Sequence, residues 1–235
     1  MGISTKSLEY EAGGQTYEGF LAMPEGTPKA VVVIVHAWGG QSEFDHDKAK
    51  LMAEWGYAGF AVDVFGKGKR GETKEECQAL IEPLVSNRSE LQNRLKLSLE
   101  AAKKESGCDK AAAIGFCFGG LCVLDMARTA MDIQGVASFH GLLGAPGNTD
   151  GKTTDVKVLV LHGWDDPMAT PEDFMAFTKE MDTAKADWQV HAYGGTMHAF
   201  TNPDANDPDF GTVYSPDAER RSLASLKDFL GELYS

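Results

Sequence analysis

Three residue types that together perform nucleophilic catalysis occur in order along the chain: Cys117, Asp166 and His198. A cysteine thiolate attacks a carbonyl carbon, a histidine takes up its proton, and a carboxylate orients the histidine. The cysteine lies in "GFCFGG" (115–120), between an apolar run and a helical pattern. Glycines two positions before and after it permit a strained strand-to-helix turn, which would hold the thiol exposed. The alternative interpretation of Cys117 is a small apolar core residue.

The carboxylate and the histidine each follow a predicted strand. Asp165 and Asp166 come after the apolar run at 156–162, and His198 comes after the run at 187–192. Asp166 is the favoured carboxylate because Pro167 restricts its backbone to extended or turn geometry, while Asp165 stays the alternative. The order Cys, Asp, His resembles the triad order of α/β-hydrolases with a cysteine in place of the serine.

The remaining histidines divide by their positions in predicted strands. His162 and His191 lie within or at the end of apolar strands, which favours packing over catalysis. His140 follows the strand predicted at 134–139, and such a residue would lie close enough to line the site. The spacing of these histidines and of the cysteines shows no metal-ligand motif, so no metal is expected.

A carbonyl attacked by a thiolate also needs donors for the developing oxyanion. The residue after the nucleophile, Phe118, supplies one backbone N–H, and the loop after the strand predicted at 31–35 should supply another. In that loop Ala37 is the predicted donor, and Gly39 and Gly40 allow the chain to curl. An ordinary glycine turn is the alternative interpretation of this loop.

The elements that must position these residues alternate between strands and helices. Alternating stretches around Gly13-Gly14 predict an antiparallel hairpin. A βαβα succession predicts a mainly parallel central sheet with helices on both faces and ligands beyond the carboxyl ends of the strands. We expect one α/β domain over residues 1–235. The predicted strands are 31–35, 58–63, 110–115, 134–139, 156–162 and 187–192, and the predicted helices are 44–56, 73–84, 87–105, 118–130, 171–184 and 216–233.

Composition excludes several classes of partner. The formal net charge of −13, spread along the chain, argues against nucleic acid. No apolar run approaches the roughly eighteen residues of a membrane span, and the first residues do not resemble a leader peptide. Four cysteines without secretory context are expected to be reduced thiols. These features predict a cytoplasmic protein that acts on a small molecule and binds neither nucleic acid nor membrane; the oligomeric state stays open.

Taken together, the elbow at Cys117, "GWDDP" around Asp166 and "GTMHAF" around His198 resemble the dienelactone hydrolase family of α/β-hydrolases, over nearly the entire chain. The segment "EWGYAGFAVDVFG" adds to the resemblance. The resemblance implies an α/β-hydrolase fold and a Cys117–His198–Asp166 triad that needs no cofactor.

Two positions depart from the pattern of that family. Where enzymes of that family have a glutamate that helps to activate the resting thiol, this chain has His36, and an imidazole cannot do the same electrostatic work as a carboxylate. His36 therefore either lines the pocket or orients the oxyanion loop. Where those enzymes have an arginine that holds the substrate carboxylate, this chain has Asn202, which can donate a hydrogen bond but carries no charge. The alternative cations are Arg70, Arg88 and Arg94.

The residues predict a cysteine-dependent hydrolase of carboxylic esters or lactones that works through an acyl-enzyme. The alternatives are acyl transfer or thioester hydrolysis by the same triad, and a non-catalytic binding protein that retains the fold. The pocket is expected to be largely apolar, which suits an unsaturated or aromatic acyl group. Its predicted lining residues are His36, Trp38, Phe116, Trp164, Phe200 and Asn202, with Phe118 as an aromatic neighbour.

Overall fold

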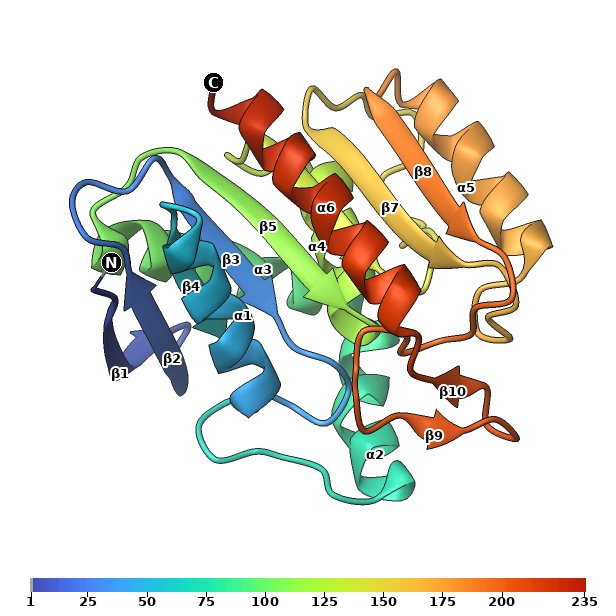
Figure 1. The fold of residues 1–235 in the computed structure, drawn as a ribbon, viewed down its shortest axis with the longest axis horizontal. Helices are drawn as coiled ribbons and strands as arrows, with labels where there is room; N and C mark the ends of the chain where they lie inside the picture. The colour runs from blue at the N-terminus through green and yellow to red at the C-terminus, as the bar shows by residue number, and fades with distance from the viewer. Residues whose placement is uncertain (1) are drawn as a thin grey trace. The chain divides into compact units, whose positions relative to one another are not determined.

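The computed structural model describes residues 2–235 and divides into two compact units, Met1–Ile114 and Gly115–Ser235. Figure 1 shows the ribbon with its elements labelled. Within residues 2–235, no helix combines the length and the apolar character needed to cross a membrane. The expectation of one domain over residues 1–235 stays a prediction.

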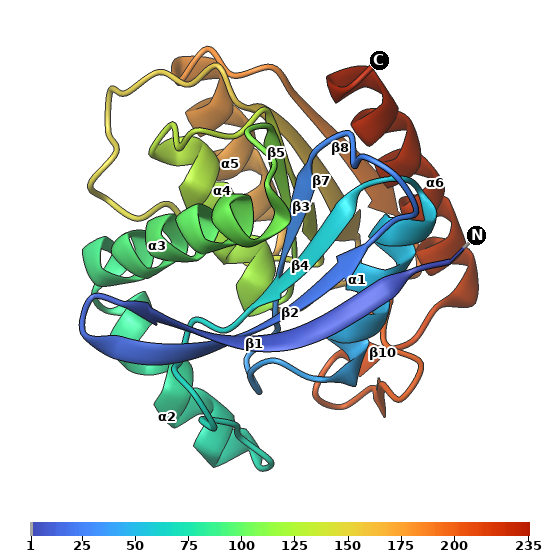
Figure 2. The same ribbon diagram turned by 90° about the vertical axis from the view of Figure 1, so that its left-hand side faces the viewer.

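The first unit begins with the predicted hairpin. Strands β1 (Ser4–Ala12) and β2 (Gln15–Met23) pair antiparallel, and Ala12 lies opposite Gln15. The two residues between the strands, Gly13 and Gly14, have φ angles of 58° and 78°. This left-handed backbone is the conformation that a two-residue hairpin turn requires and that glycine adopts without strain. Figure 2 shows the hairpin along one side of the ribbon.

Parallel pairing starts inside the same unit. Strand β2 also pairs antiparallel with β4 (Ala58–Val62), and β4 pairs parallel with β3 (Val31–Val35). Every residue of β3 and β4 is buried, which explains why both strands are uninterrupted apolar runs in the sequence. The strand order of this unit is β1-β2-β4-β3-β5, where β5 spans Ala111–Phe116 and its last residues belong to the second unit.

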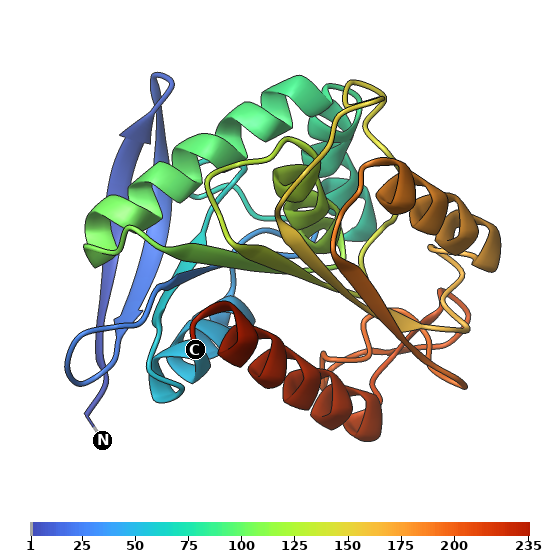
Figure 3. The ribbon, with the colours of Figure 1, turned by 90° about the horizontal axis from the view of Figure 1, so that it is seen from above.

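Helices cover both faces of this part of the sheet. Helix α1 (Glu43–Glu54) packs on β2, β3 and β4, and α3 (Arg88–Ser106) packs on β1, β3 and β4. Seen from above, α1 and α3 lie on opposite sides of these strands (Figure 3). Helix α2 (Lys74–Val85) packs against α3.

The second unit repeats the alternation of strand and helix. Its parallel pairs join β6 (Gly135–Phe139) to β7 (Lys157–Gly163) and β7 to β8 (Trp188–Tyr193), in the order β5-β6-β7-β8. Helices α4 (Phe118–Arg128) and α5 (Pro171–Thr183) lie on one face and α6 (Pro216–Leu233) lies on the other, as Figure 3 shows. The predicted α/β class, mainly parallel with an N-terminal antiparallel hairpin, is therefore confirmed.

Two helix starts follow the signals in the sequence. Thr170 accepts a hydrogen bond from the Asp173 N–H at the start of α5, and Ser215 accepts one from the Ala218 N–H at the start of α6. In both helices proline follows the capping residue, where its missing N–H costs no hydrogen bond. The apolar face of α6 is buried through residues such as Leu226 and Leu230, as a core helix requires.

Sequence reasoning missed one feature of the second unit. A short antiparallel pair, β9 (Asn206–Asp207) and β10 (Thr212–Val213), follows the segment that carries His198. Strands of two residues are too short for alternation to show in the sequence. The helix predicted to reach residue 130 ends at Arg128, because Ala130 adopts a left-handed φ of 50° that a helix cannot continue.

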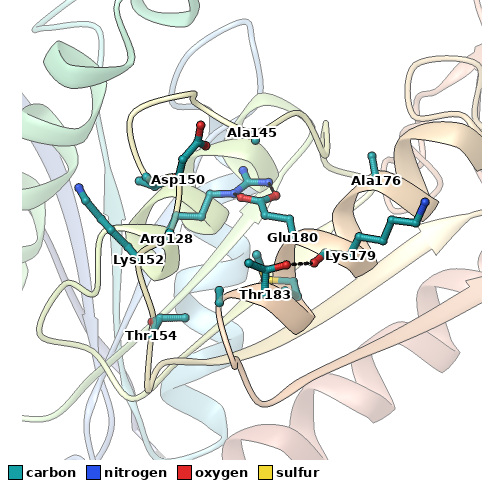
Figure 4. Close-up of a pocket in the computed structure, with 13 residues that line it drawn as sticks. Arg128, Ala145, Asp150, Lys152, Thr154, Ala176, Lys179, Glu180 and Thr183 are labelled. Carbon is teal, nitrogen blue, oxygen red and sulfur yellow. Dashed lines mark hydrogen bonds and ion pairs between the residues drawn. The ribbon is translucent and has the colours of Figure 1, made fainter.

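A buried arginine joins α4 to α5. The Arg128 guanidinium donates from Nε and one terminal nitrogen to the Glu180 carboxylate at 2.8 and 2.7 Å, and to the Leu143 carbonyl at 2.7 Å. Its other terminal nitrogen donates to the Gly144 carbonyl at 3.2 Å. Figure 4 shows the Arg128–Glu180 pair beside a cavity of about 410 Å³. These bonds tie the end of the helix that follows Cys117 to α5 and to the segment after β6.

Candidate active site

Cys117 occupies a strained corner between β5 and α4. Its backbone has φ 57° and ψ −115°, a conformation that residues with a side chain rarely adopt. The Cys117 N–H donates to the Phe139 carbonyl at 3.1 Å, and the Cys117 carbonyl accepts from the Gly120 N–H at 2.9 Å. The corner is therefore held by bonds to β6 and to the first turn of α4. The Cys117 side chain is half-buried, whereas the other three cysteines are buried.

The flanking glycines are needed because the backbone is crowded. A Cβ on Gly115 would lie 2.0 Å from the Gly119 carbonyl oxygen, and one on Gly120 would lie 2.5 Å from the Gly141 Cα. Both distances are far shorter than van der Waals contact. Only glycine at these positions lets the strand, the helix and the turn after β6 approach one another at the corner.

Asp166 and His198 form a short buried pair. The His198 Nδ1 lies 2.7 Å from the Asp166 Oδ2, and the two side chains are 2% and 0% exposed. The other carboxylate oxygen of Asp166 accepts from the Met168 N–H at 2.8 Å. An ionised carboxylate can only accept, so Nδ1 donates and the second ring nitrogen, Nε2, is left for other chemistry.

The backbone holds His198 in place from both sides. Its N–H donates to the Gly211 carbonyl at 3.0 Å, and its carbonyl accepts from the Val213 N–H at 3.1 Å. A parallel bridge between His198 and Thr212 follows from this pairing. The β9–β10 pair that the sequence did not predict thus supports the segment that carries the histidine.

The protonation of His198 is set by its partners. Burial lowers its pKa, but the charge of Cys117 and the hydrogen bond with Asp166 outweigh burial and raise the pKa to about 10. Nε2 has no partner in ordinary hydrogen-bond geometry, so Cys117 acts on it mainly through charge. Catalytic hydrogen bonds are commonly long before substrate binds. The surroundings of His198 therefore favour its cationic imidazole.

Asp165 takes no part in this pair. It is exposed, and its N–H donates to the Thr196 carbonyl at 2.9 Å. The two neighbouring aspartates therefore differ in surroundings, and Asp166 is the one that contacts His198.

The predicted pocket residues are divided between the two units. Phe116, Phe118, Trp164, Phe200 and Asn202 belong to the second unit, as do the three residues of the predicted triad. The phenylalanine side chains are fully buried, while Trp164 is 42% exposed. Asn202 is exposed, and its side-chain oxygen accepts from the Asp204 N–H at 3.0 Å, which stabilises a turn.

His36, Ala37 and Trp38 belong to the first unit. His36 is fully buried, with Nδ1 2.7 Å from the Ala37 carbonyl oxygen and Nε2 3.1 Å from the Val64 nitrogen. A backbone N–H can only donate, so Nε2 accepts and Nδ1 carries the proton. Burial lowers the pKa of His36 to about 4. A neutral His36 thus hydrogen-bonds the backbone of the loop that contains Ala37.

The arginines considered as replacement cations also belong to the first unit. Arg70 donates to the Glu18 carboxylate and to the backbone carbonyls of Gln41 and Lys69. Arg94 donates to Glu90 and to the Val64 carbonyl. Within residues 2–235, no group of three or more histidine, cysteine or acidic side chains is arranged to hold a metal ion.

Two further residues lie beside the histidine. The His140 ring packs against the His198 ring with centroids 5.1 Å apart, and its Nε2 lies 2.8 Å from the Thr201 hydroxyl oxygen. Because His140 follows a predicted strand, the sequence predicts that it lies near the candidate active site. Thr201 was missed, and its only signal in the sequence is its place three residues after His198.

Two solved structures resemble this chain over nearly its whole length, and a further relative resembles about two thirds of it. The dienelactone hydrolase-like promiscuous phosphotriesterase P91 from metagenomic libraries is 29% identical, with a TM-score of 0.91 over 99% of both chains. The structure named m3DLH is also 29% identical, with a TM-score of 0.93 over 99% of both chains. The uncharacterized Caenorhabditis elegans protein K02A2.1 is 36% identical over 161 residues, which are 65% of this chain and all of that protein.

The match to a family is equally broad. Residues 17–234 match the Dienelactone hydrolase family, which covers both units and all three residues of the predicted triad. The resemblance drawn from the elbow and the two later motifs is therefore confirmed. With the fold, the corner at Cys117 and these relatives in agreement, the chain belongs to the dienelactone hydrolase family, whose α/β-hydrolase fold it shares.

Proposed function

We propose that the protein is a cysteine-dependent hydrolase of carboxylic esters or lactones, with Cys117 as nucleophile, His198 as base and Asp166 as the group that orients the base. The observation that carries the proposal is the buried 2.7 Å Asp166–His198 bond, together with the raised pKa of His198 beside Cys117. A perturbed histidine next to a strained cysteine is the arrangement that an activated thiol needs.

The first half of the reaction forms an acyl-enzyme. The Cys117 thiolate attacks the carbonyl carbon, a C–S bond forms, and the carbonyl electrons move onto oxygen. The backbone N–H of Phe118, at the start of α4, stabilises that oxyanion. When the tetrahedral intermediate collapses, the C–O bond to the leaving group breaks, and the alkoxide takes the proton from His198 Nε2. A thioester on Cys117 and a neutral His198 remain.

The second half uses the neutral histidine as base. His198 takes a proton from water as the water oxygen attacks the thioester carbonyl. Collapse of the second intermediate breaks the C–S bond, releases the carboxylic acid and restores the thiolate beside the imidazolium. Asp166 stabilises the imidazolium whenever it is present, because its carboxylate accepts the Nδ1 proton. The triad supplies nucleophile, base and oxyanion donors, so the proposed reaction uses no cofactor.

The substrate class follows from the charge of the site. Asn202 stands where the family resemblance implies a carboxylate-binding arginine, and its side chain is engaged in a turn. We therefore propose an uncharged ester or lactone. The exposed Trp164, two residues before Asp166, suits an unsaturated or aromatic acyl group. The four free cysteines are typical of a reducing compartment, and we propose the cytoplasm as the location.

Alkylation of the thiols tests the activated cysteine. Iodoacetamide at mildly acidic pH, with the modified peptides quantified by mass spectrometry, should label Cys117 at least tenfold faster than Cys77 or Cys108. The rate of Cys117 alkylation should be lower in the His198→Asn variant than in the wild-type protein. Equal rates at the three cysteines would contradict the proposal.

Turnover tests the reaction itself. Hydrolysis of p-nitrophenyl esters should be lost in Cys117→Ala, and a lactone without a carboxylate should have a higher kcat/KM than its carboxylate-bearing analogue. Wild-type rates in Cys117→Ala would remove the nucleophile assignment. Product formation only when an alcohol or thiol is added would favour acyl transfer, and tight binding without turnover would favour the non-catalytic alternative.

A further inference from the structure

His140 is a buried histidine that the proposed reaction does not use. It follows β6, its side chain is 3% exposed, and its backbone φ is 38°. A residue other than glycine in this left-handed region is strained, so the surrounding structure has to hold it there. Strain of this kind gathers at functional sites.

The backbone around His140 is held by the same contacts that build the corner at Cys117. The His140 N–H donates to the Leu161 carbonyl of β7 at 2.9 Å. The residue before it, Phe139, accepts the Cys117 N–H, and the residue after it, Gly141, lies against Gly120 of α4. The turn that places His140 is therefore part of the corner that places the nucleophile.

The side chain of His140 reaches the other half of the triad. Its ring meets the His198 ring edge-on, with centroids 5.1 Å apart and planes at 66°, and it meets the Phe200 ring edge-on at 5.0 Å. Its Nε2 lies 2.8 Å from the hydroxyl oxygen of Thr201, which is 1% exposed. Thr201 thus holds the imidazole of His140, which packs against the imidazole of His198.

We propose that His140, anchored by Thr201, is a positioning residue that sets the plane of the His198 ring. This inference rests on the proposed function. In that plane Nδ1 stays on Asp166, which leaves Nε2 as the ring nitrogen for proton transfer with Cys117, a residue whose charge acts on His198. A simple packing role needs only the bulk of the ring, whereas the positioning role also needs the hydrogen bond between His140 and Thr201.

That difference allows a test with matched variants. Thr201→Val removes the hydroxyl but keeps the shape of the side chain, and Thr201→Ser keeps the hydroxyl. Thr154→Val is the control, because Thr154 is also a buried threonine whose hydroxyl takes part in a hydrogen bond, in its case as acceptor from the Val156 N–H, but it precedes the start of β7. For each protein, kcat and KM for a p-nitrophenyl ester, the pH profile of Cys117 alkylation and the melting temperature are measured.

The positioning role predicts a specific pattern. Thr201→Val should lower kcat about tenfold with KM within twofold, and should shift the alkylation profile of Cys117 to higher pH by half a unit or more. Thr201→Ser should restore both, and Thr154→Val should leave both unchanged. A lower melting temperature in Thr201→Val with wild-type kcat and alkylation profile would overturn the inference.

The two proposals fail in different ways. If His198→Asn leaves Cys117 alkylation at the wild-type rate, the proposed catalytic pair is wrong. If His198→Asn slows alkylation but Thr201→Val and His140→Phe both keep the wild-type kcat and profile, only the positioning role is wrong.

Discussion

His198 is the residue whose surroundings change its ordinary chemistry most. Its burial would favour the neutral ring, yet the charge of Cys117 and the short bond to Asp166 raise its pKa to about 10. Asp166 controls which ring nitrogen carries the fixed proton, because its carboxylate accepts from Nδ1. Its neighbour Asp165, identical in type, is exposed and does not contact the ring.

The aspartate pair therefore supplies a matched prediction. Asp166→Asn removes the charge that stabilises the imidazolium and lets an amide N–H face Nδ1, which favours the wrong tautomer. We expect kcat for a p-nitrophenyl ester to fall by about a thousandfold or more. Asp165→Asn should stay within twofold of wild type in the same assay. Similar losses in both variants would contradict the assignment of Asp166.

Among the elements, the junction of β5, α4 and the turn after β6 is the most constrained. Gly120 of α4 and Gly141 after β6 touch through their backbones, and the Cys117 N–H is bonded to β6. Arg128 fixes the far end of α4 to α5. The helix is thereby held at both ends, and its amino end presents its N–H groups next to the sulfur.

A single methyl group should disturb this junction. In Gly120→Ala the new Cβ would meet the Gly141 Cα at 2.5 Å and the Ser138 Oγ at 2.7 Å, and the backbone neighbour cannot give way cheaply. We expect a loss of about 3 kcal/mol or more in unfolding free energy, together with lower kcat. Gly144→Ala is the control, because nothing lies within 4 Å of its Cβ position. Equal urea midpoints for the two variants would contradict the crowding argument.

For the molecule as a whole, buried titratable groups link stability to pH. The neutral His36 is fully buried and has a pKa lowered to about 4 by burial. An unfolded histidine takes up its proton near pH 6.5. The unfolded chain therefore binds more protons between about pH 6.5 and 4, and stability falls as the pH is lowered through that range. Over the full range His36 contributes a loss of roughly 3 kcal/mol.

Urea unfolding of His36→Asn isolates this contribution. Asparagine keeps a donor and an acceptor but does not titrate, so the variant should lose less stability than wild type between pH 7.5 and 4.5. Asp45, whose pKa burial raises to about 6, acts in the opposite direction, but both proteins contain it. An equal loss in the two proteins would contradict a neutral buried His36.

Local patterns in the sequence predicted much of the fold. Apolar runs, capping residues with a following proline, and Gly13-Gly14 predicted every strand and helix except the short β9–β10 pair, within two or three residues at each end. These signals work because hydrophobic periodicity and turn chemistry act over a few residues. The two-residue strands gave no periodic signal, although they hold the segment of His198.

The sequence by itself determined the identity and order of the candidate triad, the glycines around Cys117 and the family, because each depends on residue type and spacing. Tertiary structure decided which aspartate contacts His198, how the ring of His36 is bonded, and that His140, held by Thr201, packs against the candidate base. The physical reason is the sequence separation of the interacting groups. Side-chain orientation, burial and pKa depend on groups far apart in the sequence, such as His140 and Thr201 at 61 residues, which only the folded chain brings together.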